Sequence, residues 1–167
     1  KVDALNKQIE DLIAKQVRTT TTLTKEQQLI AGGFEANQGR LPWPVEKGFI
    51  SGFFGKHQHP VHEHVTVNNK AIYLQTFSGA QARAIYEGEV TSCAQINGNY
   101  AVIVQHGNYR SVYSPLKKIH VKQGDKLKPK QAIGEIATNT AEDNKTELYF
   151  QIYKDRSILN PGLWLAQ

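Results

Sequence analysis

The chain has 167 residues, of which 40% are hydrophobic and 21% charged, with a formal net charge of +5. This length accommodates one medium-sized domain with an appendage, and no apolar run approaches the roughly 20 residues of a membrane span. The positive charge is compatible with an anionic partner, but scattered lysines without stacking aromatics argue against nucleic acid. Cys93 is alone, which excludes a disulfide framework and a cysteine-based zinc site.

Residues 2–18 predict a helix. Val2, Leu5, Ile9 and Leu12 recur at alternating spacings of three and four residues, with polar residues between them. The pattern suits either the end of a coiled coil that self-associates or an ordinary amphipathic helix on its own domain.

A second, shorter helix is expected over residues 25–37. Thr24 is the expected N-cap, with Gln27 as its capping-box partner, after a run of threonines that disfavours helix. Leu29, Ile30 and Phe34 would share one face. We therefore place a helical segment and linker at residues 1–38 and a β-domain at residues 39–167.

The β-domain opens with an extended segment and a loop rich in histidine. Pro42 and Pro44 favour extended backbone, which makes Trp43 an expected anchor onto the domain. The loop that follows carries His57, His59, His62 and His64, which are weak candidates for metal ligands. Pro60 and the need for convergent geometry favour a solvated loop instead.

Residues 100–136 carry the strongest strand pattern. An apolar run at 102–104 ends at Gly107-Asn108, and a second run follows at once, which is a hairpin signal. Gly124-Asp125 predicts a further turn, and Ile133 with Ile136 a further strand. Short strands with frequent turns indicate a mainly β fold with an antiparallel core.

Several motifs resemble one known family. They are Leu-Pro-Trp-Pro-Val (41–45), Val-Ile-Val-Gln-His-Gly (102–107), Ser-Val-Tyr-Ser-Pro-Leu (111–116), Val-Lys-Gln-Gly-Asp-Lys-Leu (121–127) and Asn-Pro-Gly-Leu-Trp-Leu (160–165). Together they are similar to the LytM-type (lysostaphin-like) zinc endopeptidases of bacterial cell walls, over residues 41–165. The resemblance is greatest to the catalytically degenerate EnvC/NlpD-like branch. It implies a duplicated-hybrid-motif-like β-core that follows a coiled coil.

The resemblance also implies that the zinc site has been lost. Active members carry three zinc ligands and two catalytic histidines, and the positions that match them here are Asn69, Tyr73, Pro115, Glu147 and Tyr149. An amide, two protonated phenols and one carboxylate cannot retain zinc, and Pro115 cannot move a proton. We therefore expect no cofactor and no hydrolase activity. These residues, with Tyr113 one strand across, would instead line a partner-binding cleft.

The expected function follows from the same resemblance. A degenerate domain of this branch would be an exported, periplasmic module of the cell envelope whose partner is an N-acetylmuramoyl-L-alanine amidase. Its cleft would receive a regulatory helix of that enzyme. Alternatives are a non-catalytic peptidoglycan-binding module and a divergent metallopeptidase that uses the 57–64 histidines. The N-terminal helices are also candidates to cover the cleft, and the signal segment would lie outside this fragment.

Overall fold

The computed structural model describes residues 2–19, 22–58, 66–141 and 143–166. Two helices, α1 (Val2–Thr19) and α2 (Lys25–Ala36), precede the strands. The strands are β1 (Phe49–Gly52), β2 (Gly55–Gln58), β3 (Thr66–Asn69), β4 (Ile72–Thr76), β5 (Gln81–Arg83), β6 (Gly88–Ile96), β7 (Asn99–His106), β8 (Tyr109–Ile119), β9 (Lys126–Leu127), β10 (Ala132–Ile136), β11 (Thr138–Asn139), β12 (Lys145–Lys154) and β13 (Ser157–Leu159), followed by the 3-10 helix η1 (Pro161–Leu163).

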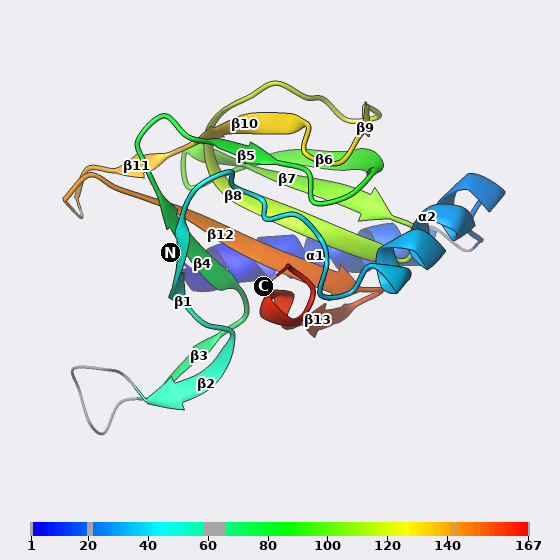
Figure 1. Cartoon of the computed structure of the whole chain (residues 1–167), viewed down its shortest axis with the longest axis horizontal. Coiled ribbons are helices and arrows are strands. Elements are labelled where there is room, and N and C mark those ends of the chain that lie inside the picture. The colour runs from blue at the N-terminus through cyan, green and yellow to red at the C-terminus, as the bar shows by residue number, and fades with distance from the viewer. Residues whose placement is uncertain (1, 20–21, 59–65, 142, 167) are drawn as a thin grey trace.

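The strands form one large antiparallel sheet with the order β1-β4-β12-β8-β7-β6-β9. Strand β10 pairs with β8 and β5, β11 and β13 pair with β12, and β2 with β3 forms a separate hairpin that projects from the body (Figure 1). The expected mainly β, antiparallel fold is confirmed. The predicted hairpin at Gly107-Asn108 joins β7 and β8, and the turn at Gly124-Asp125 leads into β9.

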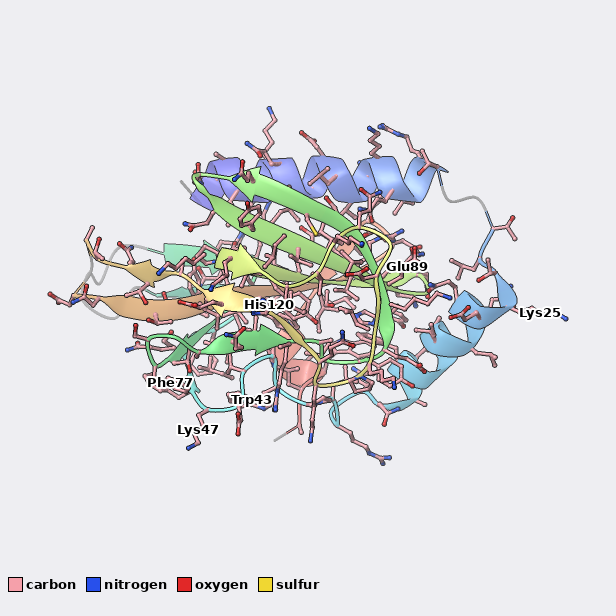
Figure 2. All side chains as sticks on the ribbon, turned by 90° about the horizontal axis from the view of Figure 1, so that it is seen from above. Lys25, Trp43, Lys47, Phe77, Glu89 and His120 are labelled. Atoms are coloured by element: carbon pink, nitrogen blue, oxygen red, sulfur yellow. The ribbon has the colours of Figure 1, made fainter. Side chains whose placement is uncertain are left out.

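Both faces of the sheet are covered. Side chains alternate along each strand, so Val102 and Val104 enter the main core while Ala101 and Ile103 point to the other face. The main core also receives β5, β10 and the C-terminal segment. Helix α1 crosses the other face and runs along the top of the molecule in Figure 2.

Helix α1 is held by Ile9, which belonged to the predicted periodic face, and by Ile13, which did not, while Leu5 and Leu12 are only partly buried. Ile9 and Ile13 are fully buried against Ile103, Val112 and Tyr153. Each buried aliphatic side chain contributes about 1.5–3 kcal/mol of transfer free energy. The apolar face that could pair with a second helix is thus used within its own chain, and self-association through it would require α1 to leave the sheet.

Helix α2 begins and packs largely as expected. Thr24 caps it by accepting the Gln27 amide at 3.1 Å. The Gln27 side chain does not complete the capping box, because its Oε1 accepts the amide of Gly107 at 2.7 Å. Ile30 and Phe34 are buried, but Leu29 is 78% exposed, so the prediction that all three share the buried face was wrong for Leu29.

The two ends of the β-domain meet. Trp43 Nε1 donates to the Ala166 carbonyl at 2.7 Å, and Leu41 forms a bridge with Leu165. Trp164 is buried in the main core. The expected anchoring role of Trp43 is confirmed. No described helix is long and apolar enough to cross a bilayer.

Candidate functional site

The residues that match the zinc positions gather mainly on one face of β4 and β12. Leu148 and Phe150 alternate into the main core, which turns Glu147 and Tyr149 to the opposite face. Tyr149 pairs with Tyr73 across the two strands, and their rings meet edge to face at 5.0 Å. Tyr73 and Tyr149, which the family resemblance matches to two zinc-ligand positions, are therefore in contact.

The same face continues to the sheet edge. Glu147 pairs with Gln75, which in turn pairs with Phe49 on β1, and residues opposed in this way point to the same side. Phe49 is 57% exposed. We call the surface of Phe49, Ser51, Tyr73, Gln75, Glu147 and Tyr149 the β1–β4–β12 face; it combines an exposed aromatic edge with polar groups.

Helix α1 covers the Tyr149 end of this face. Asn6 Oδ1 accepts the Tyr149 hydroxyl at 2.8 Å and the Gln151 amide at 3.3 Å. Gln151 also donates to the Lys70 carbonyl at 3.1 Å, and Lys70 Nζ pairs with Glu10 of α1 at 2.9 Å. Tyr149 is only 4% exposed as a result. The N-terminal half of α1 is thus bonded to the candidate site itself.

Burial also fixes the protonation of Tyr149. Loss of solvent raises the pKa of its phenol, which outweighs the hydrogen bond to Asn6, while Asp3 and Glu10 raise that pKa further. The hydroxyl therefore stays protonated through neutral pH and donates a hydrogen bond. A protonated phenol is a poor zinc ligand.

The Glu147 carboxylate also has partners within the protein. Its Oε2 accepts a short hydrogen bond from the Ser51 hydroxyl and lies 3.3 Å from Lys145 Nζ. Asn69 donates through Nδ2 to the Phe53 carbonyl at 2.9 Å. Among the residues that the structure describes, no three His, Cys, Asp or Glu side chains converge as a metal site would require. The donor set at the matched positions does not fit a catalytic zinc ion, which needs about three converging ligands.

Pro115 lies at the rim of the face. It follows Ser114, which pairs with Tyr149, and its carbonyl accepts the Ala137 amide at 3.0 Å. This places Pro115 where β8 leaves β12 and turns toward β10.

Tyr113 does not belong to this surface, and its assignment to the cleft is corrected. It pairs with Phe150 and is fully buried in the main core. Its hydroxyl accepts hydrogen bonds from the Ile85 amide at 3.1 Å and the Ser111 hydroxyl at 2.9 Å. Burial raises the pKa of this phenol. The physical reason is alternation, since the chain neighbours of Tyr113 point to the opposite face of the sheet, where Val112 packs beneath α1.

The histidine candidates fall elsewhere. His59, His62 and His64 lie outside the described residues, and so does the side chain of His57 in β2. His106 is buried, as expected for a structural histidine, with its ring between the Glu87 carbonyl and the Ser111 hydroxyl at 2.8 Å each. His120 lies just past the end of β8, is exposed, and bonds Gln81 at 2.8 Å.

A groove of about 700 Å³ adjoins Tyr149 between α1 and the β3–β4 connection. Its walls carry the charged residues Asp3, Lys7, Glu10, Asp11 and Lys70, with the amides Asn6, Asn68 and Asn69. Sequence reasoning expected Asn69 and Tyr149 here but missed every α1 residue, because contacts between residues 6 and 149 leave no local sequence signal. The groove is polar, and the apolar part of the surface is the Phe49 edge.

Comparison with known proteins identifies the scaffold. Residues 67–161 match the model of peptidase family M23. The chain belongs to this family. An uncharacterised protein of Neisseria meningitidis is 31% identical over 137 residues, which are 81% of this chain and 22% of that protein. The peptidoglycan DD-endopeptidase ShyB of Vibrio cholerae is 32% identical over 115 residues, which are 66% of this chain and 26% of that protein.

Among solved structures, the complex of SpoIIIAH and SpoIIQ contains a similar chain. It aligns with a TM-score of 0.61 and 26% identity, over 73% of this M23 chain and 97% of the other. The LytM-type, lysostaphin-like resemblance read from the sequence is confirmed by the family match. This chain spans only about a fifth to a third of the length of the first curated relatives it matches.

Proposed function

We propose that this M23 domain is a non-catalytic interaction module of the bacterial cell envelope that activates an N-acetylmuramoyl-L-alanine amidase. The observation that carries the proposal is the contact between Tyr73 and Tyr149, the two tyrosines that the family resemblance matches to zinc-ligand positions, together with the hydrogen bond from Tyr149 to α1. A related chain of similar fold is described in a complex with another protein, which supports a binding role. The domain would act in the periplasm after export.

The partner would bind along the β1–β4–β12 face. Phe49 offers exposed apolar area, and Gln75 and Glu147 beside it offer polar groups. An amphipathic helix laid against such a surface is a recurring mode of recognition. Helix α1 already occupies the Tyr149 end, so a partner helix reaches only the open part until α1 moves.

Activation in this scheme is a shift between two states of the amidase. The domain favours the active state only if it binds that state more tightly than the blocked one. Movement of α1 adds a second equilibrium, because contacts of Asn6 and Glu10 with the sheet compete with the partner. Helix α1 would therefore set how readily the domain binds the amidase.

The test measures dye release from labelled peptidoglycan by a purified amidase with and without this protein. Stimulation by the wild-type chain, lost in Phe49→Ala and kept in Leu29→Ala, is expected, because both residues are exposed but only Phe49 lies on the face. Dye release by the protein alone, with zinc found by elemental analysis, would refute the non-catalytic role. Failure to bind or stimulate any cell-wall amidase would refute the partner.

A second candidate is peptidoglycan binding without catalysis. It is favoured by the similarity to a peptidoglycan DD-endopeptidase over two thirds of the chain. The wild-type protein would then sediment with purified sacculi, and Tyr73→Ala would weaken this, because Tyr73 is partly exposed on the face. Sedimentation that is unchanged in Tyr73→Ala would remove the β1–β4–β12 face as the sugar or peptide site.

A further inference from the structure

The protein's net charge is concentrated in one short stretch. Residues 117–130, here called the lysine segment, contain six lysines and a single acidic residue, Asp125. Their balance equals the net charge of +5 for the whole chain, so the remainder of the protein is formally neutral. The lysines are thus not evenly scattered along the chain. They are gathered in the stretch that runs from the last residues of β8 to the connection before β10.

Two similar turns hold this segment in shape. The Lys122 amide donates to Asp125 Oδ2 at 2.9 Å, and the Asp125 amide donates back to the Lys122 carbonyl at 3.1 Å. In the second turn, the Lys128 amide donates to Gln131 Oε1 at 2.9 Å, and the Gln131 amide donates back to the Lys128 carbonyl at 3.1 Å. Each turn therefore starts at a lysine whose backbone groups are both satisfied, which leaves the side chain to point outward.

Buried neighbours fix the direction of the charges. Val121, Leu127 and Ile133 enter the main core. The six lysines of the segment are all exposed, namely Lys117, Lys118, Lys122, Lys126, Lys128 and Lys130. Figure 2 looks onto this edge of the molecule, with His120 near its centre. The segment is therefore an outward-facing array of ammonium groups.

Most of these charges are not neutralised. Lys126 pairs with Glu26 at 3.2 Å and Lys117 with Glu135 at 4.0 Å. The other four have no carboxylate within 4.0 Å in the part of the chain that the structure describes. Glu89, paired in register with Lys126, lies at the border.

We infer that the lysine segment binds the surface of a bilayer that contains anionic lipids. The segment has no aromatic residue, so it lacks the stacking platform by which single-stranded nucleic acid is held. Lysine ammonium groups are point charges without the planar fork that recognises single phosphates, which suits a diffuse anionic surface. Juxtaposed lysines near such a surface add about 1 kcal/mol each, or about fivefold in binding.

This contact is compatible with partner binding. Strand β9 of the lysine segment and strand β1 of the β1–β4–β12 face are the two ends of the sheet order. A domain held to lipid through the lysine segment would leave Phe49 and Gln75 accessible. The inference is independent of the amidase partner, because it rests on charges that the proposed function does not use.

The test is sedimentation of the whole chain with vesicles of phosphatidylcholine alone or with about one third phosphatidylglycerol, at low and physiological salt. The variant Lys118→Gln/Lys122→Gln/Lys128→Gln should lose about 100-fold in binding to the anionic vesicles. The matched control, Lys15→Gln/Lys47→Gln/Lys56→Gln, removes the same charge from exposed sites outside the segment and should bind nearly as the wild type.

Circular dichroism melting of both variants establishes that they fold. Binding by the wild type and control but not by the segment variant supports the inference. No binding to anionic vesicles, or equal loss in both triple variants, overturns it. Tighter binding to soluble polyglutamate than to vesicles would also overturn it and would assign the segment to an acidic protein.

Discussion

The two N-terminal helices are attached to the same sheet by different means. In α2, the ring of Phe34 lies 4.8 Å from those of both His106 and Tyr109 and 5.1 Å from that of Trp164. In α1, Ile9 and Ile13 are buried with Leu5, Leu12 and Val17 partly buried beside them, and polar contacts hold the helix near both ends. Asn6 binds Tyr149, and near the other end Gln16 accepts from Arg110 Nε at 2.7 Å.

The difference indicates which helix can move. Close approach of α2 depends on Gly107, where an added Cβ would lie 2.3 Å from Ala31 Cβ and 2.7 Å from the Gln27 carbonyl oxygen, so α2 is fitted to the β7–β8 turn. The polar contacts of α1 can be exchanged for water at small net cost, since a typical hydrogen bond contributes about 0.5–1.5 kcal/mol. We therefore expect α1 to open before the rest of the domain, while α2 unfolds with it.

The largest expected effect is on α2. Phe34→Ala removes a fully buried ring from an aromatic cluster and should lower the free energy of unfolding by about 3–5 kcal/mol. Denaturant unfolding measures this. Leu29→Ala on the same helix is the control and should change stability by less than about 0.5 kcal/mol, because its side chain is 78% exposed. Equal effects of the two would show that α2 is not part of the cooperative core.

The His106 side of the same cluster predicts a dependence on pH. The pKa of His106 is lowered from 6.5 to about 4, because complete burial, helped by the nearby Arg110 guanidinium, outweighs the raising effect of the hydrogen bond to the Glu87 carbonyl. Because the unfolded chain binds a proton more readily, the free energy of unfolding should fall as pH drops from about 6.5 to about 4, by up to about 3 kcal/mol. Urea titrations across this range measure the slope.

The variant His106→Gln should flatten that part of the pH profile, whatever its effect on stability at neutral pH. A wild-type slope that survives in His106→Gln would assign the proton uptake to another group.

A smaller and more local effect is expected for α1. Ile13→Ala should weaken its attachment by about 2 kcal/mol, because Ile13 is 1% exposed on the sheet. Hydrogen exchange of α1 amides should accelerate, while exchange in β7 and β8 remains nearly unchanged. Lys15→Ala is the control on the exposed side of α1. Equal acceleration in β7 would mean that α1 is integral to the fold.

The smallest effect is expected at Asn6. Asn6→Ala leaves the Tyr149 hydroxyl without its acceptor and should cost about 1 kcal/mol or somewhat more. Exchange in the first turns of α1 reports it, with Asp11→Asn as the control at an exposed position. Under the proposed function, Asn6→Ala should also increase amidase stimulation, since the cover is weakened; reduced stimulation would make α1 part of the binding surface.

Much of the fold could be predicted from local sequence patterns. Runs such as 102–104 and turns such as Gly107-Asn108 specify their own conformation, so the β7–β8 hairpin followed directly. The helices were predicted because Ile9 and Phe34 fall on periodic faces. The division of the chain at residue 38 stays a prediction; α1 nevertheless packs onto the β-domain.

The site was harder to predict, because it depends on pairing across the sheet. Tyr113 and Tyr149 both belong to strands, but only the β8–β12 register, which pairs Tyr113 with Phe150, shows that they point to opposite faces. The Tyr149–Asn6 contact joins residues far apart in the sequence. The density of lysines in residues 117–130 can be read from the sequence. That their side chains point outward depends on which neighbouring residues are buried, which the sequence alone does not give.

The direction of α1 across the sheet has a mechanical consequence. Its N-terminal end lies over Tyr149 and its C-terminal end near Thr91 and Arg110. Tension applied at the N-terminus would peel the helix turn by turn, and the Asn6 contact would yield before Ile9 and Ile13. Uncovering Tyr149 would thus require only the first two turns to detach, with the remaining turns still seated as a hinge.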